Sequence, residues 1–558
     1  MQSIFGASIQ KSIFVERKYK MRKIIITISV LVIAVFAAVW LYFSNISASE
    51  STTEKAFNAI PADASLIFEY KNESSYYDIF KDFTLFKDVL GEDIMKHLTA
   101  LKNTFIDDAG FNEALFASEL YFSIHQTSKN QADVLIIAPL KNKQLELSQE
   151  GINNLKQKFK VTEKLLDKTT LYTLIFNNQS KFYFTLAKTI WIGSFNENLV
   201  QKAVLESSNK KQKFFKGESF SSVRNKNAIA NLYINYPNLA SFLAGFSKKD
   251  KPAETENLKT FPAFSSLNIN YQKNAFMFSG ITELEQKGSY PALFLKQQSG
   301  KCTLLDLVPF DAASYLFYLV SNQQTFQNDL NTLFEKRKEI GKRKSQLQNI
   351  SETHSINIEK EFPVVLGKEF GCIQVASGNK IGIIKTTNTG RLSFILSTIS
   401  TSINSKISRF DDSDLLYYHL GDPFKGFRRP YYAIIENHLL VSNNMQALNG
   451  FLKNYEEQDF LSRTDKNLQF QQYLSNQGNI FYFLHNSNAK AVVKSYLSSK
   501  ANKQFKGEEF GWKNVYGISI QFSADKDKFF TNLYMSKVPE LEDVNPQADS
   551  LLLDSLLK

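Results

Sequence analysis

An antiparallel hairpin is predicted by the stretch LNINYQKNAFMFSGI, which covers residues 267–281. Apolar and polar residues alternate from Leu267 to Tyr271, and this period of two is typical of a strand with one buried and one wet face. The polar triplet 272–274 supplies a turn, and residues 275–281 supply the returning strand. Strands that follow each other in this way form an antiparallel sheet.

A second hairpin is predicted at residues 171–186, where two apolar strands flank the polar turn 177–180. Apolar residues recur at helical spacing around 76–85 and again around 199–204. Strands and helices do not follow the βαβ rhythm that predicts a parallel sheet. We therefore expect an α+β fold with antiparallel sheets and flanking helices.

Four blocks of sequence recur in the same order, each separated from its counterpart by 248–251 residues. The pairs are Pro61–Ala64 with Pro309–Ala312, Ile190–Ser194 with His438–Ser442, Leu232–Asn238 with Tyr482–Asn488, and Leu267–Tyr271 with Ile518–Phe522. An ordered set of this kind indicates an internal duplication. It predicts two tandem units, at residues 56–298 and 302–538.

The segment Ile24–Phe43 contains no charged residue and no proline. As a helix it would span roughly 30 Å, the thickness of a bilayer's hydrocarbon core. The basic residues directly before it are Arg17, Lys18, Lys20, Arg22 and Lys23. Basic residues stay on the cytoplasmic side, which predicts a cytoplasmic segment 1–23, a transmembrane helix 24–43 and a linker 44–55.

This topology makes the membrane itself a partner and predicts a single-pass inner-membrane protein, N-in/C-out, with its bulk in the periplasm. A cleaved signal peptide is the alternative, because Ser47-Ala48-Ser49 resembles a cleavage site. Residues 1–23 carry +5 of the net charge of +11, so the long remainder is only mildly basic. No nucleic-acid partner is expected from this balance.

Sequence motifs for chemistry are missing: there is no G-x-S-x-G elbow, phosphate-binding P-loop, H-E-x-x-H or G-x-G-x-x-G. The histidines lie too far apart in sequence to form a local metal site, and we expect each to be structural. They are His97, His125, His354, His419, His438 and His485. We therefore predict no catalytic, cofactor-binding or metal-binding residues and no cofactor.

Three charged clusters have ordinary interpretations. Asp411, Asp412 and Asp414 lack the spacing of a calcium loop and are expected in an exposed turn. The basic run 336–344 is expected on the solvated face of one long helix near 323–350, with contact to anionic lipid or polysaccharide as the alternative. The lysines of 210–216 are expected in a loop.

The two cysteines, Cys302 and Cys372, are expected to be isolated buried thiols, although a disulfide would be permitted outside the cytoplasm. The tail 539–558 is predicted to be an acidic linker followed by a short C-terminal helix at 549–558. The leucines of that helix either pack on the protein's own body or insert into the groove of an envelope protein partner.

The layout of basic flank, apolar segment and Ile60-Pro61-Ala62-Asp63-Ala64-Ser65 before a strand resembles membrane-anchored extracytoplasmic envelope proteins of Bacteroidota type. The resemblance implies location and architecture and supplies no activity or site residue. We expect a binding or scaffold protein of the cell envelope rather than an enzyme. The alternatives are an envelope hydrolase with scattered site residues and a carrier of lipid or another apolar ligand, which would need a wide apolar cavity.

Overall fold

The computed structural model describes most of the chain from residue 52 to residue 538. The described ranges are 52–71, 99–106, 119–166, 169–208, 224–225, 228–248, 261, 263–272, 274–284, 288–506 and 514–538. The predicted transmembrane segment 24–43, the helical stretch 76–85, the lysine-rich 210–216 and the tail 539–558 lie outside these ranges. No helix within them is both long and apolar enough to cross a membrane.

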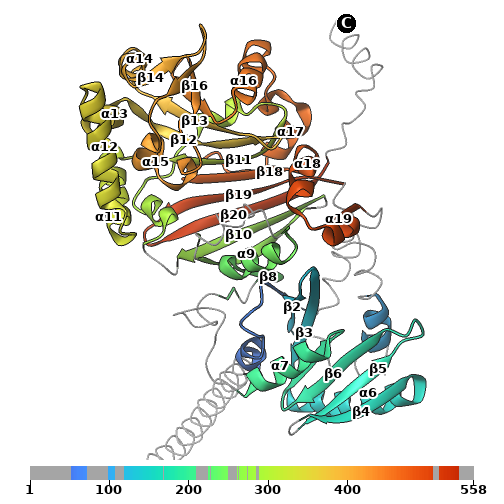
Figure 1. Ribbon diagram of the computed structural model, residues 1–558. Helices are drawn as coiled ribbons and strands as arrows, with labels where there is room; N and C mark the ends of the chain where they lie inside the picture. The colour runs from blue at the N-terminus through green and yellow to red at the C-terminus, as the bar shows by residue number, and fades with distance from the viewer. Residues whose placement is uncertain are drawn as a thin grey trace, which may run out of the picture.

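One antiparallel sheet of twenty strands organises the described chain (Figure 1). The N-terminal half-sheet consists of β1 (Leu66–Lys71), β2 (Glu119–Ser128), β3 (Gln131–Pro139), β4 (Lys160–Leu166), β5 (Thr169–Ile175), β6 (Lys181–Ala187), β7 (Ile190–Ser194), β8 (Ala230–Asn235), β9 (Ala263–Gln272) and β10 (Ala275–Leu284). The C-terminal half-sheet consists of β11 (Ala312–Leu319), β12 (Leu366–Val375), β13 (Lys380–Thr386), β14 (Ser400–Ser402), β15 (Ser408–Phe410), β16 (Tyr431–Ile435), β17 (His438–Ser442), β18 (Ile480–His485), β19 (Val515–Asp525) and β20 (Lys528–Lys537). The expected antiparallel α+β class is confirmed.

Strands pair in the same order in both half-sheets. The N-terminal order is β4-β5-β6-β7-β3-β2-β1-β8-β9-β10. The C-terminal order is β14-β15-β16-β17-β13-β12-β11-β18-β19-β20. The predicted hairpins at 171–186 and 267–281 are confirmed as β5–β6 and β9–β10.

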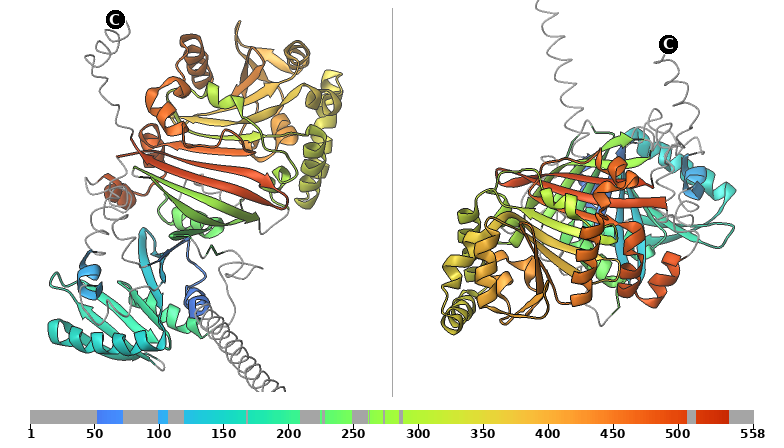
Figure 2. Two further views of the ribbon diagram at one scale, coloured as in Figure 1. Left: turned by 180° about the vertical axis from the view of Figure 1, so that it is seen from behind. Right: turned by 90° about the horizontal axis from the view of Figure 1, so that it is seen from above.

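The pairing of β10 with β20, here called the seam, joins the two half-sheets; in Figure 2 the green β10 lies beside the red β19 and β20. Ser279 faces Asn532 across the seam, and each is the fifth residue of its strand. Matching strands therefore meet about an approximate twofold axis at this residue pair.

The same axis relates two helices beside the seam, α9 (Tyr236–Gly245) and α18 (Asn486–Tyr496). Their trailing segments form a β-bridge between Ser247 and Leu497. Two matching backbone hydrogen bonds flank the bridge, from the Lys248 amide to the Tyr496 carbonyl and from the Ser498 amide to the Phe246 carbonyl, each 2.8 Å long. The two halves are thus tied together at two places.

Buried side chains also cross the seam. Hydroxyl groups of Ser265 and Thr282 lie 2.5 Å apart, and those of Thr282 and Thr531 lie 2.6 Å apart. One hydrophobic cluster contains Leu267 of the N-terminal half together with Phe522 of the C-terminal half. The halves therefore share a core instead of packing as separate bodies.

The same side-chain caps occur at equivalent positions of the two halves. In the N-terminal half the Ser194 hydroxyl donates to the Val134 carbonyl at 2.8 Å, and Asn196 caps α7 (Glu197–Ser207). In the C-terminal half Ser442 donates to Lys380 at 2.8 Å, and Asn444 caps α16 (Met445–Glu457). A Ser-x-Asn sequence after a buried strand thus ends the strand and begins the helix in each half.

The pairing of the strands shifts one of the four block alignments by two residues. Asn231 pairs with Asn268, and Phe481, which the sequence blocks align with Asn231, pairs with Gln521. Asn268 therefore matches Gln521, two residues beyond Ser519, with which the sequence blocks align it. A slip of two residues leaves every side chain on the same face, so alternation alone does not reveal it.

The expectation of one long helix near 323–350 is wrong. The segment forms two helices, α11 (Gln323–Lys336) and α12 (Ile340–His354), because the chain turns at Lys338, which has a left-handed φ of 58°. Figure 1 shows α11, α12 and α13 (Ile358–Val365) in a column along one side of the C-terminal half-sheet.

The basic run is consequently not one solvated face. The Arg337 guanidinium binds both carboxylate oxygens of Asp422, at 2.5 and 2.8 Å. Arg343 is only 3% exposed and donates to Glu359 at 2.8 Å. Two of the predicted surface cations therefore hold the helices in place.

Cys302 and Cys372 do not form a disulfide with each other, as expected. Cys302 is buried, and its burial raises the pKa of its thiol. Cys372 is half-buried, and its Sγ lies 3.2 Å from the Pro423 carbonyl oxygen. Neither thiol has the exposed, electropositive setting of a reactive cysteine.

The seam predicts which engineered cysteines will join the halves. Ser279→Cys with Asn532→Cys should form a disulfide under mild oxidation, because directly paired antiparallel residues have Cα atoms roughly 4.5–5.5 Å apart. Ser279→Cys with Gln521→Cys is the control, since Gln521 lies one strand further away, roughly 10 Å from Ser279. Mass spectrometry of tryptic peptides reads out the bond. Equal cross-linking of both pairs would contradict the seam.

Candidate functional site

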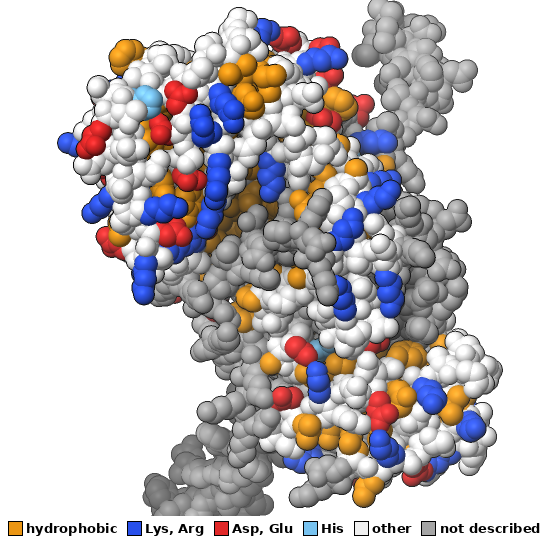
Figure 3. All heavy atoms as spheres, viewed as in Figure 1, with side chains coloured by type: hydrophobic (Ala, Val, Ile, Leu, Met, Phe, Trp, Pro, Cys, Tyr) orange, Lys and Arg blue, Asp and Glu red, His pale blue; other side chains and the backbone are white. Residues whose placement is uncertain are grey.

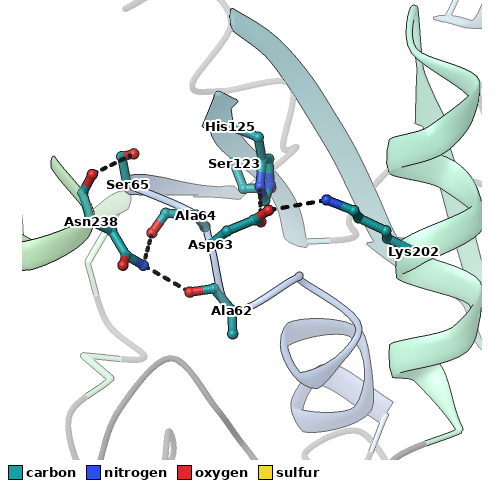
Figure 4. Close-up of polar contacts among 8 residues, drawn as sticks. All are labelled: Ala62, Asp63, Ala64, Ser65, Ser123, His125, Lys202 and Asn238. Atoms are coloured by element: carbon teal, nitrogen blue, oxygen red, sulfur yellow. Dashed lines mark hydrogen bonds and ion pairs between the residues drawn. The ribbon is translucent and has the colours of Figure 1, made fainter. Parts of the chain in front are cut away.

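The two recurring Pro-x-Asp-Ala loops are held by the same asparagine contact. The Asn238 side-chain amide donates to the carbonyls of Ala62 at 2.7 Å and Ala64 at 2.9 Å (Figure 4). In the C-terminal half Asn488 donates to the carbonyls of Phe310 at 2.8 Å and Ala312 at 3.0 Å. Each asparagine lies in the first turn of its helix, α9 or α18, and fixes the chain just before it enters β1 or β11.

The aspartate of the first loop, Asp63, belongs to a line of hydrogen-bonded side chains, Asp63–His125–Ser123, that the second loop lacks. His125 Nδ1 lies 2.7 Å from Asp63 Oδ1, and His125 Nε2 lies 2.8 Å from the Ser123 hydroxyl (Figure 4). Lys202, on α7, approaches the other carboxylate oxygen at 3.3 Å. In the neutral imidazole Nδ1 donates to the carboxylate, and Nε2 then accepts the serine proton.

This line has the connectivity of a hydrolytic triad, but its exposure is reversed. Ser123 is 1% exposed and His125 is 0% exposed, whereas the Asp63 side chain is 49% exposed. A nucleophile must reach its substrate, and here the group nearest to solvent is the acid. The hydrogen bond from His125 lowers the pKa of Asp63 to about 2, so the carboxylate is charged and holds its loop against β2.

The matching positions of the C-terminal half are apolar. Ile67 pairs with Ser123 in β2, and Tyr315 pairs with Ile373 in β12. Two residues further on, Val375 takes the place of His125. Asp311 is left with a hydrogen bond of 3.2 Å from Asn454, and burial raises its pKa.

A second polar cluster lies deeper in the N-terminal half, around the buried carboxylate of Glu69. Arg224 donates to Glu69 at 2.6 Å and Tyr233 donates at 2.6 Å, while Asn231 donates at 2.9 Å. Arg224 also binds Glu119 at 3.0 Å. With a fourth, longer hydrogen bond of 3.4 Å from the Tyr121 hydroxyl, these donors occupy the lone pairs of Glu69, which leaves it no acceptor site for a ligand.

The C-terminal half has aromatic residues where this cluster stands: Phe317, Phe481 and Phe483 are all buried. Its own polar cluster lies elsewhere, where Lys385 donates to Glu369 at 2.9 Å and to the Thr303 hydroxyl at 2.8 Å. Although burial opposes ionisation of Glu369, the hydrogen bonds from Lys385 and Thr303 lower its pKa. Lys385 donates to both Glu369 and the Thr303 hydroxyl, which is the geometry of a hydrogen-bond donor and not that of a base toward Thr303.

The aspartates at 411–414 do not converge. Asp411 accepts from Thr401 at 2.7 Å, Asp412 pairs with His354 at 2.9 Å, and Asp414 begins the next helix with a φ of 65°. Among the described residues no group of three His, Cys, Asp or Glu side chains is placed to hold a metal ion.

One open depression of about 590 Å³ lies where α12 meets α13. Polar residues dominate its lining, which includes Lys344, Gln348, Ser351, Glu352 and Glu359. Charges of both signs and wide exposure to solvent distinguish it from an enclosed, mainly apolar ligand pocket.

Sequence reasoning missed the Asp63–His125–Ser123 line. Ser123 and His125 are two residues apart on a strand, and that spacing places them on one face. The missing information was the partner, because Asp63 lies far away in sequence and reaches His125 only through the β1–β2 pairing.

Comparison with protein-family models, with curated proteins and with solved structures gives no match for this chain.

The asparagine contacts predict matched losses of stability. Asn238→Ala and Asn488→Ala should each lower the free energy of unfolding by about 1–3 kcal/mol, because each leaves two carbonyls without their donor. Urea denaturation measures the loss. Asn270→Ala is the control, since within the described part of the chain its exposed amide donates to Ser279 alone. If Asn238→Ala or Asn488→Ala left the free energy of unfolding unchanged, that asparagine would not be needed to hold its loop.

Acid should change the contributions of Asp63 and Asp311 to the stability of the protein in opposite directions. A carboxylate whose folded pKa is lowered stabilises the protein above its unfolded pKa of roughly 3.9, and this contribution is lost as pH falls toward 2. Asp63→Asn should therefore lower stability at neutral pH, by at most about 1 kcal/mol because the side chain is half exposed. Asp311→Asn should leave stability unchanged or raise it, because the folded pKa of Asp311 is raised. Thermal melts at neutral and acid pH compare the two variants.

Proposed function

We propose that the protein is a single-pass membrane-anchored binding or scaffold protein whose bulk lies in the periplasm. In this account residues 24–43 span the inner membrane, and residues 56–298 and 302–538 are duplicated units. Support for the duplication comes from the shared strand order, the paired asparagine contacts and the paired Ser-x-Asn caps. The sequence layout of basic flank and apolar segment supports the anchor and the resemblance to envelope proteins.

One observation favours binding over catalysis: the polar clusters close on themselves. Glu69 is saturated by its internal donors, and Glu369 holds Lys385 and Thr303. Ser123 lies beneath the surface behind Asp63. Each cluster fixes a loop or a strand, which is what a rigid platform for a partner requires.

A hydrolase is the first alternative, because the Asp63–His125–Ser123 line has the connectivity of a triad. It would require Ser123 to become accessible. Labelling of Ser123 by a fluorophosphonate, lost in Ser123→Ala, would favour it.

A carrier of an apolar ligand is the second alternative. Figure 3 shows hydrophobic side chains gathered in a hollow of the viewed face, over β19 and β20 as labelled in Figure 1. The same view shows Lys and Arg side chains scattered among acidic ones rather than gathered in one patch. Many described phenylalanines serve as ordinary core, among them Phe317, Phe326 and Phe334.

The test is proximity labelling in intact cells with a peroxidase fused after Lys558. We expect biotin on periplasmic and envelope proteins, and a shorter set of labelled proteins when 549–558 is deleted, if that predicted helix docks on a partner. A cytoplasmic fusion of the same peroxidase controls for background. Labelling of cytoplasmic proteins by the full chain would overturn the orientation, and an unchanged set after the deletion would remove the docking role of 549–558.

A further inference from the structure

The helices α12 and α13 meet at a sharp corner in the C-terminal half. Ser355 ends α12 with a left-handed φ of 53°, and Asn357 caps α13 through the Lys360 amide. The depression of about 590 Å³ opens at this corner and reaches down to Leu347 and Ile356, which are both buried. Solvent thus approaches the corner from one side, while its other side packs on the core.

His419 lies beneath the corner, in the short buried helix α15 (Leu415–Leu420). It is 0% exposed, and neither ring nitrogen has a hydrogen-bond partner among the described residues. Its ring packs on Phe362 of α13 at 5.2 Å, and its carbonyl accepts from Gln327 of α11 at 2.9 Å. The site therefore suits a neutral imidazole and provides no acceptor for a proton on the second nitrogen.

The charged groups around the ring oppose its protonation. Arg343 of α12 donates to the neighbouring Tyr418 carbonyl at 3.2 Å, and its cation faces His419. The nearby carboxylate of α13, Glu359, is already paired with Arg343 and is half exposed. From α11 the group in contact is the uncharged amide of Gln327. A charged imidazole would add a second buried cation beside Arg343.

We propose that His419 makes the α12–α13 corner an acid-sensitive cover, which swings off α15 when the ring takes up a proton. The left-handed residue Lys338 provides the hinge before α12, and the left-handed Ser355 lets α12 and α13 tilt against each other. Opening would expose the buried apolar side chains Leu347, Ile350 and Phe362. This device is independent of what the protein binds.

The size of the effect follows from linkage. Burial and the Arg343 cation lower the pKa of His419 to about 3 in the closed corner, against 6.5 for a free ring. A basic group whose pKa is lower in the closed state stabilises that state at neutral pH. This stabilisation is lost progressively as pH falls below 6.5, where the ring takes up a proton in the open state. Between about pH 7 and pH 4.5 the opening constant should rise on the order of 70-fold.

Hydrogen exchange with mass spectrometry on the full chain in detergent tests this proposal. After correction for intrinsic rates, α12–α13 peptides of the wild type should lose protection on acidification by roughly that factor, while α16 peptides should change much less. His419→Leu should abolish most of the difference, and His419→Gln gives the same readout if the leucine variant folds poorly.

The matched control is His438→Leu, which removes another buried histidine with an unpartnered ring nitrogen, on β17. It should leave the acid response of α12–α13 unchanged. An equal loss of protection in the His419 variants would overturn the proposal, as would a wild-type corner that opens no more than α16.

Discussion

The antiparallel pairing of β10 with β20 is the interaction on which the rest of the structure depends. Without it each half-sheet would expose a long edge strand, and such edges invite pairing with other chains. The pairing also places α9 beside α18 and lets one hydrophobic cluster extend through both halves. The twofold arrangement resembles a symmetric dimer within a single chain.

The two halves share a backbone and differ in what they bury. In the N-terminal half Glu69 pairs with Arg224 and accepts from Asn231, whereas the C-terminal half has Phe317 in the place of Glu69 and Phe481 in the place of Asn231. A buried ion pair is costly to desolvate and is often no more stabilising than an apolar replacement. The polar interior of the N-terminal half is therefore weak evidence for stability, and it shows that matching strands of the two halves bury different chemistry.

Periodicity in the sequence predicted the antiparallel class and both tested hairpins, since burial on one face imposes alternation. It did not reveal the two-residue difference between Gln521 and Ser519, because alternation repeats at that step. It also missed the break between α11 and α12, because the left-handed residue there is Lys338 and not a glycine. The line from Asp63 to Ser123 was out of reach for a different reason: its members meet only after β1 and β2 have paired.

Cooperative unfolding of both halves tests the central claim most directly. Trp191 in the N-terminal half and the thiol of Cys302 in the C-terminal half are both buried and supply natural probes. In a chain whose other tryptophans, Trp40 and Trp512, are replaced by phenylalanine, Trp191 fluorescence and Cys302 alkylation should follow urea with the same midpoint. Two separate transitions would show that the halves are independent bodies and would contradict the account.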